Sequence, residues 1–172
     1  MSDLSHLESH IFINVPSLSN IDFDQTDGRP PNEIIEIFGN GYMKECENYC
    51  QSNTEIKNYI CDSSNALHNF NFPTLPCDII VYRGVNSTNS TLNKYFSASL
   101  YPSCAIQFTR KNLQAIHLSK GTRALFVGGY TINNHLLPEF EIIVAEPMPI
   151  QKLFQQDLSI DNTVYTVDFC QI

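Results

Sequence analysis

The sequence lacks several features that would place it in a large class of proteins. It has no Trp, and none of its apolar runs approaches the roughly 20 residues that a membrane-spanning helix requires. Residues 1–10 contain no Lys or Arg ahead of an apolar stretch, so they do not read as a secretory signal peptide. We therefore expect a cytoplasmic protein with no membrane partner.

Cysteine is sparse as well. The 6 Cys stand at irregular intervals without a Cys-x-x-Cys pair, too few for a disulfide scaffold in 172 residues. We expect reduced, mostly buried thiols and no metal. A zinc-stabilised interaction module remains an alternative, because Cys46 and Cys50 share one face of a predicted helix and Cys61, His68 and Cys77 follow.

Basic residues are few and unevenly distributed. The 10 Lys and Arg against 18 Asp and Glu give a net charge of −8, which argues against general binding to nucleic acid. Residues 1–78 hold 3 basic and 12 acidic side chains, whereas residues 79–138 hold 6 basic and no acidic ones. Such a local field suits a phosphate-bearing small ligand, and it equally suits a basic surface that pairs with the acidic half.

The remaining composition is that of a packed globule. With 42% hydrophobic and 16% charged residues, the chain can bury one sizeable core, which predicts a single domain over residues 1–172. Within it, residues 1–31 form a leader ending in a Gly- and Pro-rich turn, residues 32–72 are helical, and residues 79–172 form a mainly β core.

Apolar periodicity defines the elements of this domain. Spacings of three and four predict helices over residues 32–52 and 54–70, and a short helix over residues 101–111. Short runs rich in Ile, Val, Tyr and Phe predict strands at residues 79–83, 94–99, 113–118, 123–127, 139–145 and 163–170. Helices followed by strands indicate an α+β fold.

Two strands carry residues suited to binding a phosphate or a ribose. Arg83 ends an apolar strand and is followed by Gly84, so five guanidinium donors stand beside a position that permits close backbone approach. An Arg paired with a surface carboxylate is the structural alternative. Ser97 and Ser99 place two hydroxyls on one face of the next strand, although such triplets also occur by chance.

A third strand opens with two carboxylates. In extended geometry, Glu139 and Glu141 lie on one face roughly 6.5 Å apart, close enough to serve one reaction centre. Glu45 and Glu47 have the same spacing in a predicted helix, where positions i and i+2 point to different sides. The strand pair is therefore the candidate catalytic pair.

In chain order, these three strands resemble the Arg-Ser-Glu class of mono-ADP-ribosyltransferases, which use NAD as donor. Residues 96–108 resemble the Ser-x-Ser strand and following helix of that class, and 44 residues separate Ser97 from Glu141. Through residues 82–85, 97–99 and 163–169 the chain is most similar to the small arginine-modifying enzymes of T-even-type bacteriophages. The resemblance implies N-terminal helices and a split β-sandwich around an NAD cleft.

The resemblance also implies the residues that bind NAD. Arg83, with Tyr82 beside it, binds the phosphates, and the backbone of Gly84 holds the nicotinamide amide. Phe108 stacks on the nicotinamide ring. NAD is then a co-substrate.

Catalysis is assigned in the same way. Ser97 supports the ribose and the catalytic Glu141, Glu139 prepares the acceptor, and the loop of residues 128–138 contacts the target. Elementary chemistry agrees, because a fixed carboxylate stabilises an oxocarbenium-like transition state and a protonated guanidinium acceptor needs a second carboxylate to take its proton. The expected partner is a host protein with an accessible arginine, and the enzyme is expected to be a monomer in the host cytoplasm.

Other activities fit the same motifs. Water in place of the target makes the protein an NAD glycohydrolase, and the acceptor can be another side chain or a nucleic acid. A catalytically inactive relative that binds a partner through the same fold is a further alternative. His6, His10, His68, His117 and His135 form no nucleophile–base arrangement, and His117 is predicted to be structural.

Overall fold

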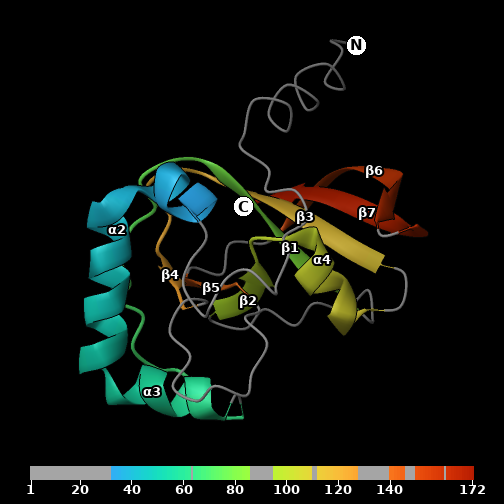
Figure 1. The fold of residues 1–172 in the computed structure, drawn as a ribbon. Coiled ribbons are helices and arrows are strands. Elements are labelled where there is room, and N and C mark those ends of the chain that lie inside the picture. The colour runs from blue at the N-terminus through green and yellow to red at the C-terminus, as the bar shows by residue number, and fades with distance from the viewer. Residues whose placement is uncertain are drawn as a thin grey trace.

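The computed structural model describes residues 32–62, 64–85, 95–109, 112–127, 140–145, 150–160 and 162–172 (Figure 1). Its helices are α2 (Asn32–Ser52), α3 (Thr54–Cys61) and α4 (Pro102–Ala105), the last continued by the 3₁₀ turn η2 (Ile106–Phe108). Its strands are β1 (Ile79–Gly84), β2 (Tyr95–Ser99), β3 (Asn112–Leu118), β4 (Ala124–Phe126), β5 (Glu141–Ala145), β6 (Gln151–Ile160) and β7 (Thr163–Gln171). The α+β class predicted from the sequence is confirmed.

The described strands form a 7-stranded sheet in the order β4-β5-β2-β1-β3-β7-β6. Neighbours pair antiparallel except β3 and β7, which are parallel. The strand pairing is shortest in the middle of the sheet. β1 pairs with β3 from Ile79 to Gly84, whereas β1 pairs with β2 only at Tyr82, which lies opposite Ser99. The strand pairing is therefore shortest between β1 and β2, with β4-β5-β2 on one side and β1-β3-β7-β6 on the other.

Helices α2 and α3 lie on the β4 side of this sheet. In Figure 1, α2 runs beside β4 at the left, and α3 follows at the lower end of α2. Strands β6 and β7 lie at the right, on the opposite side of the molecule from α2. The ring of Phe38 on α2 packs 6.2 Å from that of Phe126 on β4, and the Tyr42 hydroxyl donates to the carbonyl oxygen of Ala124 at 2.6 Å. The front helices are thus joined to the sheet through buried aromatic side chains.

The second helix is shorter than predicted, and the short helix after β2 is also interrupted. α3 begins where the Asn53 side chain accepts from the amide of Ile56, and it ends at Cys61 rather than near residue 70. Asp62 stops it, because its carboxylate accepts from the amide of Ser64 and competes with helix continuation. The expected helix over residues 101–111 is α4 followed by η2, so Ala105 is buried while Phe108 is 51% exposed.

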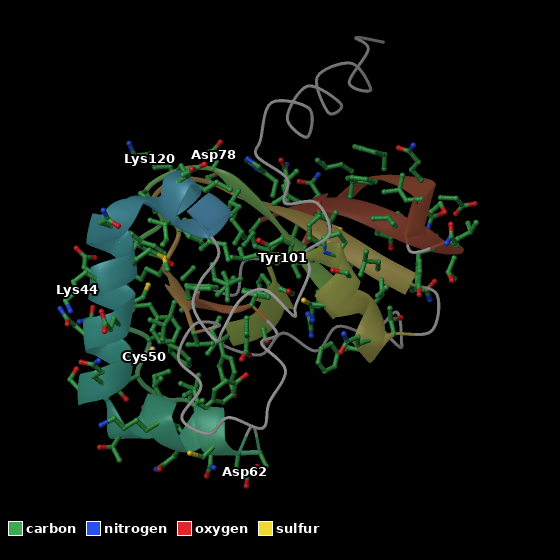
Figure 2. All side chains as sticks on the ribbon, in the orientation of Figure 1. Lys44, Cys50, Asp62, Asp78, Tyr101 and Lys120 are labelled. Atoms are coloured by element: carbon green, nitrogen blue, oxygen red, sulfur yellow. The ribbon has the colours of Figure 1, made fainter. Side chains whose placement is uncertain are left out.

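The cysteines are free thiols, and four of the 6 are buried: Cys46, Cys50, Cys104 and Cys170. Figure 2 shows Cys50 on the inner side of α2. No three His, Cys, Asp or Glu side chains in the described ranges come together as a metal site. The residues of the zinc alternative have other neighbours, since Cys77 donates to the carbonyl of Ile37 and His68 pairs with Glu55.

His117 lies on β3 and is buried, with its Nε2 3.2 Å from a carboxylate oxygen of Asp78. It therefore links β3 to the residue that directly precedes β1, which agrees with the prediction of a structural residue. His6, His10 and His135 fall outside the described residues, as does the leader. Across the described ranges, no helix has both the length and the apolar character that a membrane crossing demands.

Candidate active site

The predicted Ser97 and Glu141 side chains meet in the structure. β2 and β5 run antiparallel with Ser99 opposite Glu141 and Ser97 opposite Ile143, so the two side chains lie diagonally on neighbouring strands. The Ser97 hydroxyl donates to Oε1 of Glu141 at 2.5 Å. Ser99 is used differently, because it is buried and its hydroxyl accepts from the amide of Tyr101. Of the two hydroxyls, Ser97 belongs to the candidate site.

A second donor to Glu141 comes from helix α3. The Tyr59 hydroxyl donates to the same Oε1 at 2.8 Å across 82 residues of sequence. Burial and the neighbouring Glu141 carboxylate raise the pKa of Tyr59, so its hydroxyl stays protonated and can donate. In the described part of the chain, no hydrogen-bond donor reaches Oε2 of Glu141. The carboxylate is held by one oxygen and presents the other.

Arg83 lies at the neighbouring end of β1. Its guanidinium carbon is 5.7 Å from the centroid of the Phe96 ring, and Phe96 directly precedes Ser97 on β2. Desolvation lowers the pKa of Arg83, which reflects the cost of keeping this guanidinium half-buried. Among the described residues no carboxylate pairs with it, so the structural alternative of a surface ion pair does not hold there. Its donors remain available to an anion.

At Gly84, the end of β1 lies very close to the backbone of α4 and η2. A Cβ at this position would lie 2.7 Å from the carbonyl oxygen of Ala105 and 3.0 Å from the backbone carbon of Phe108. Glycine therefore lets α4 and η2 pack directly over the end of β1. This contact places the backbone of Phe108 against Gly84, while its side chain is 51% exposed.

Tyr82 occupies the other face of β1. Successive side chains of a strand alternate, which separates Tyr82 from Arg83. Its half-buried ring packs with Ile80, Ala115 and Val167, and this burial raises the pKa of its hydroxyl. The structure does not bring Tyr82 together with Arg83, and its assignment to NAD binding stays a prediction.

Known proteins resemble this chain in structure rather than in sequence. No protein-family profile matches the sequence, and no curated protein matches it. The similar solved structures include bacterial ADP-ribosyltransferases, several of them toxins.

Three of these structures illustrate the likeness. The protein C3stau2 from S. aureus, solved with NAD, has a TM-score of 0.49 and 14% identity over 91% of this chain and 97% of its own. An ADP-ribosyltransferase from Clostridium botulinum has a TM-score of 0.47 and 12% identity over 92% and 100%. The toxin Plx2a from Paenibacillus larvae has a TM-score of 0.46 and 12% identity over 81% and 89%. A likeness this distant assigns no role to an individual side chain.

The pairing of the two carboxylates stays a prediction, and the structure shows one departure from its extended geometry, at Phe140. β5 begins at Glu141, and Phe140 has a φ of 46°, which lies in the left-handed region rather than in extended backbone. The alternation of a strand therefore does not relate residue 139 to residue 141. Phe140 is instead buried, with its ring 5.0 Å from that of Tyr101 and its carbonyl accepting from Leu100. Glu139 and the loop of residues 128–138 lie outside the described residues.

No local signal in the sequence indicates that Tyr59 belongs to the site. Its position within an amphipathic helix is that of an ordinary core aromatic, and it is indeed mostly buried. What identifies it is the acceptor of its hydroxyl, since a buried tyrosine requires a hydrogen-bond partner and here the partner is Glu141. That information depends on the packing of α3 against β5 and is absent from the local pattern.

Proposed function

We propose that this protein is an ADP-ribosyltransferase that transfers ADP-ribose from NAD to an acceptor, with arginine as the favoured side chain. One observation carries the proposal. A carboxylate, Glu141, is fixed through one oxygen by Ser97 while its second oxygen accepts nothing in the described part of the chain. A carboxylate held in this way is suited to stabilising positive charge that develops on a ribose.

The proposed reaction breaks the bond between the ribose C1′ and the nicotinamide nitrogen. The bonding electron pair leaves with nicotinamide, which is released as a neutral pyridine, and C1′ becomes oxocarbenium-like. Glu141 stabilises this cation in the transition state more than in the ground state, and this difference lowers the barrier. An acceptor nitrogen then donates a pair to C1′ and loses a proton to a nearby base, for which we propose Glu139.

The remaining residues divide the binding of NAD among them. Arg83 binds the pyrophosphate, since its half-buried guanidinium has no carboxylate partner among the described residues. The backbone around Gly84 holds the nicotinamide amide, and the exposed ring of Phe108 stacks on the pyridine. A guanidinium that can bind an anion and an exposed aromatic ring are the groups that a dinucleotide donor requires.

The acceptor and its source follow from the resemblance to the phage enzymes. We propose a host protein that presents an arginine to the loop of residues 128–138, in the cytoplasm of a host cell. The assignment of the chain as one domain and as a member of the Arg-Ser-Glu class belongs to the same proposal. Transfer to water competes with transfer to protein in this chemistry, so the acceptor has to be identified by experiment.

The test follows both products of the reaction. Wild-type protein and the Glu141→Gln variant are incubated with NAD labelled in its adenosine half and with a bacterial lysate. Free nicotinamide and label on macromolecules are then measured together. Label on protein from the wild type alone, removed by agents that cleave arginine-linked ADP-ribose, is the expected result.

Other results identify other functions. Nicotinamide release without any label assigns an NAD glycohydrolase, and label on nucleic acid changes the acceptor. Failure of the wild type to bind NAD or to release nicotinamide contradicts the proposal. Binding of NAD without release identifies a catalytically inactive relative.

A further inference from the structure

Helix α3 contributes one polar side chain to the candidate site. We propose that Tyr59 is a positioning residue, which fixes the Glu141 carboxylate so that Oε2 faces the ribose of NAD. The inference rests on the proposed function and extends it, because it makes the helical part of the chain a component of the NAD-cleaving centre.

The first support is that two donors converge on one oxygen. The hydroxyls of Ser97 and Tyr59 both donate to Oε1 of Glu141, the first from the neighbouring strand and the second from the helix. One hydrogen bond leaves a carboxylate free to rotate about its terminal torsion, which has a broad energy well. Two donors from different directions fix its plane. The second oxygen then points in one defined direction.

The second support is that Tyr59 itself is held firmly. Its ring meets the ring of Tyr95 edge-on, with 6.2 Å between centroids and an interplanar angle of 87°. Tyr95 in turn packs 5.5 Å from Phe70, so three aromatic rings lie in sequence beside the site. The helix is fixed at its start by the Asn53 cap and by the buried Ile56. A donor supported in this way can position a carboxylate without a conformational change.

The third support concerns chemistry. A carboxylate that stabilises an oxocarbenium ion must be placed within a few tenths of an ångström of its working position, and misplacement by about 1 Å costs roughly 100-fold in rate. Removing the Tyr59 hydroxyl leaves the ring and its packing in place but removes one of the two restraints. The effect should therefore appear in the chemical step and not in the binding of NAD.

The experiment compares two matched variants, each of which loses one hydroxyl from the cluster of three aromatic rings. Tyr59→Phe removes the donor to Glu141, whereas Tyr95→Phe leaves both donors to Glu141 in place. The rate of nicotinamide release is measured as a function of NAD concentration for both variants and the wild type. The free energy of unfolding is measured for Tyr59→Phe, for Glu141→Ala, which removes the acceptor, and for the double variant.

We expect Tyr59→Phe to lower kcat about 10- to 100-fold with KM unchanged within about twofold. Tyr95→Phe should retain the wild-type kcat. The unfolding free energies should be non-additive, because Tyr59 and Glu141 are in contact. This combination supports the proposal.

Three results overturn it. An active wild type with an equally active Tyr59→Phe variant contradicts the positioning role and leaves the proposed function intact. Equal losses in Tyr59→Phe and Tyr95→Phe, or a rise in KM in place of a fall in kcat, assign Tyr59 a structural role. A wild type that releases no nicotinamide removes the proposed function and this inference together, and the stability measurements then report the contact alone.

Discussion

Two tyrosines connect the front helices to the sheet, and each reaches across 82 residues of sequence. Tyr42 on α2 donates to the backbone carbonyl of Ala124 on β4, inside the apolar core. Tyr59 on α3 donates to the side chain of Glu141 on β5. Burial raises the pKa of both hydroxyls, so both act as hydrogen-bond donors.

We call the Tyr42–Ala124 hydrogen bond the structural junction and the Tyr59–Glu141 hydrogen bond the functional junction. The two junctions differ in the group that accepts the hydrogen bond. A backbone carbonyl in the core has no further chemistry, and its hydrogen bond contributes to stability alone. A carboxylate whose second oxygen accepts no hydrogen bond from the described residues can act on a ligand. The same residue type, donating from neighbouring helices, therefore serves the fold at one junction and the candidate active site at the other.

The functional junction can be broken from the sheet side by Ser97→Ala. We expect kcat for nicotinamide release to fall about 10- to 100-fold, because a hydrogen bond to a charged group contributes about 1.5–3 kcal/mol and here it orients the carboxylate. Ser99→Ala, two positions along the same strand, should lower stability and leave kcat unchanged, since its hydroxyl accepts from Tyr101. If Ser97→Ala and Ser99→Ala had the same kcat, the hydrogen bond from Ser97 would not be what orients Glu141 for the reaction.

Gly84→Ala is expected to displace α4 and η2, the elements that contain Ala105 and Phe108. The added Cβ meets the Ala105 carbonyl at 2.7 Å, and overpacking of this kind costs about 1–3 kcal/mol. We expect a lower melting temperature together with weaker NAD binding. Gly41→Ala is the matched control, because Gly41 lies in α2 just after the kink at Gly39, and an added Cβ would meet no atom within 4 Å. That change should raise stability by about 0.5–1 kcal/mol, and loss of stability in both variants would argue against a specific contact at Gly84.

The structural junction is tested by Tyr42→Phe. Loss of the 2.6 Å hydrogen bond leaves the Ala124 carbonyl without this donor and should lower the free energy of unfolding by about 1–2 kcal/mol. Denaturant unfolding measures this change, and nicotinamide release under conditions where the variant is folded should match that of the wild type. If Tyr42→Phe lowered kcat as much as Tyr59→Phe, the Tyr42 hydrogen bond would affect the reaction as well as the stability of the fold.

The smallest effect is expected just before the start of β1, where Asp78 and Lys120 lie side by side (Figure 2). The amide of Lys120 donates to Asp78 at 2.8 Å, and this bond, aided by His117, lowers the pKa of Asp78 below 3.8. A carboxyl whose pKa is lower in the folded state stabilises the fold above its unfolded value and loses that contribution as pH falls through the folded value.

Asp78→Asn should therefore reduce stability at neutral pH by a small amount and flatten the loss of stability in acid. Urea midpoints at neutral pH and at pH values below 3.8 measure the difference. An acid dependence identical to that of the wild type would mean that Asp78 makes no pH-linked contribution, and the NAD chemistry would be unaffected.

The sequence predicts the apolar parts of this fold well and its polar parts poorly. β1, β2, β3 and β5 follow from short apolar runs, whereas β6 went unpredicted. β6 contains three Gln among mostly exposed positions, and a bulge between Lys152 and Phe154 breaks the alternation that would have indicated a strand. It is a strand because β7 pairs with it along its length.

The candidate site shows the same division. Ser97 and Glu141 were predicted from a resemblance based on their order along the chain, and the structure brings them into contact. Local alternation did not indicate the left-handed backbone of Phe140, which precedes β5. Tyr59 could not have been found from local pattern, since its role depends on where α3 packs. Contacts that close over long sequence separations are the part of a site that a single sequence conceals.

The most direct test measures NAD binding and nicotinamide release in the same samples of wild type and Glu141→Gln. An amide retains the shape of the carboxylate and can still accept from Ser97 and Tyr59, but it carries no charge. We predict unchanged affinity for NAD with release slowed about 100- to 1000-fold. Release at the wild-type rate from Glu141→Gln would contradict the account, because the reaction would then proceed without the carboxylate on which the site is built.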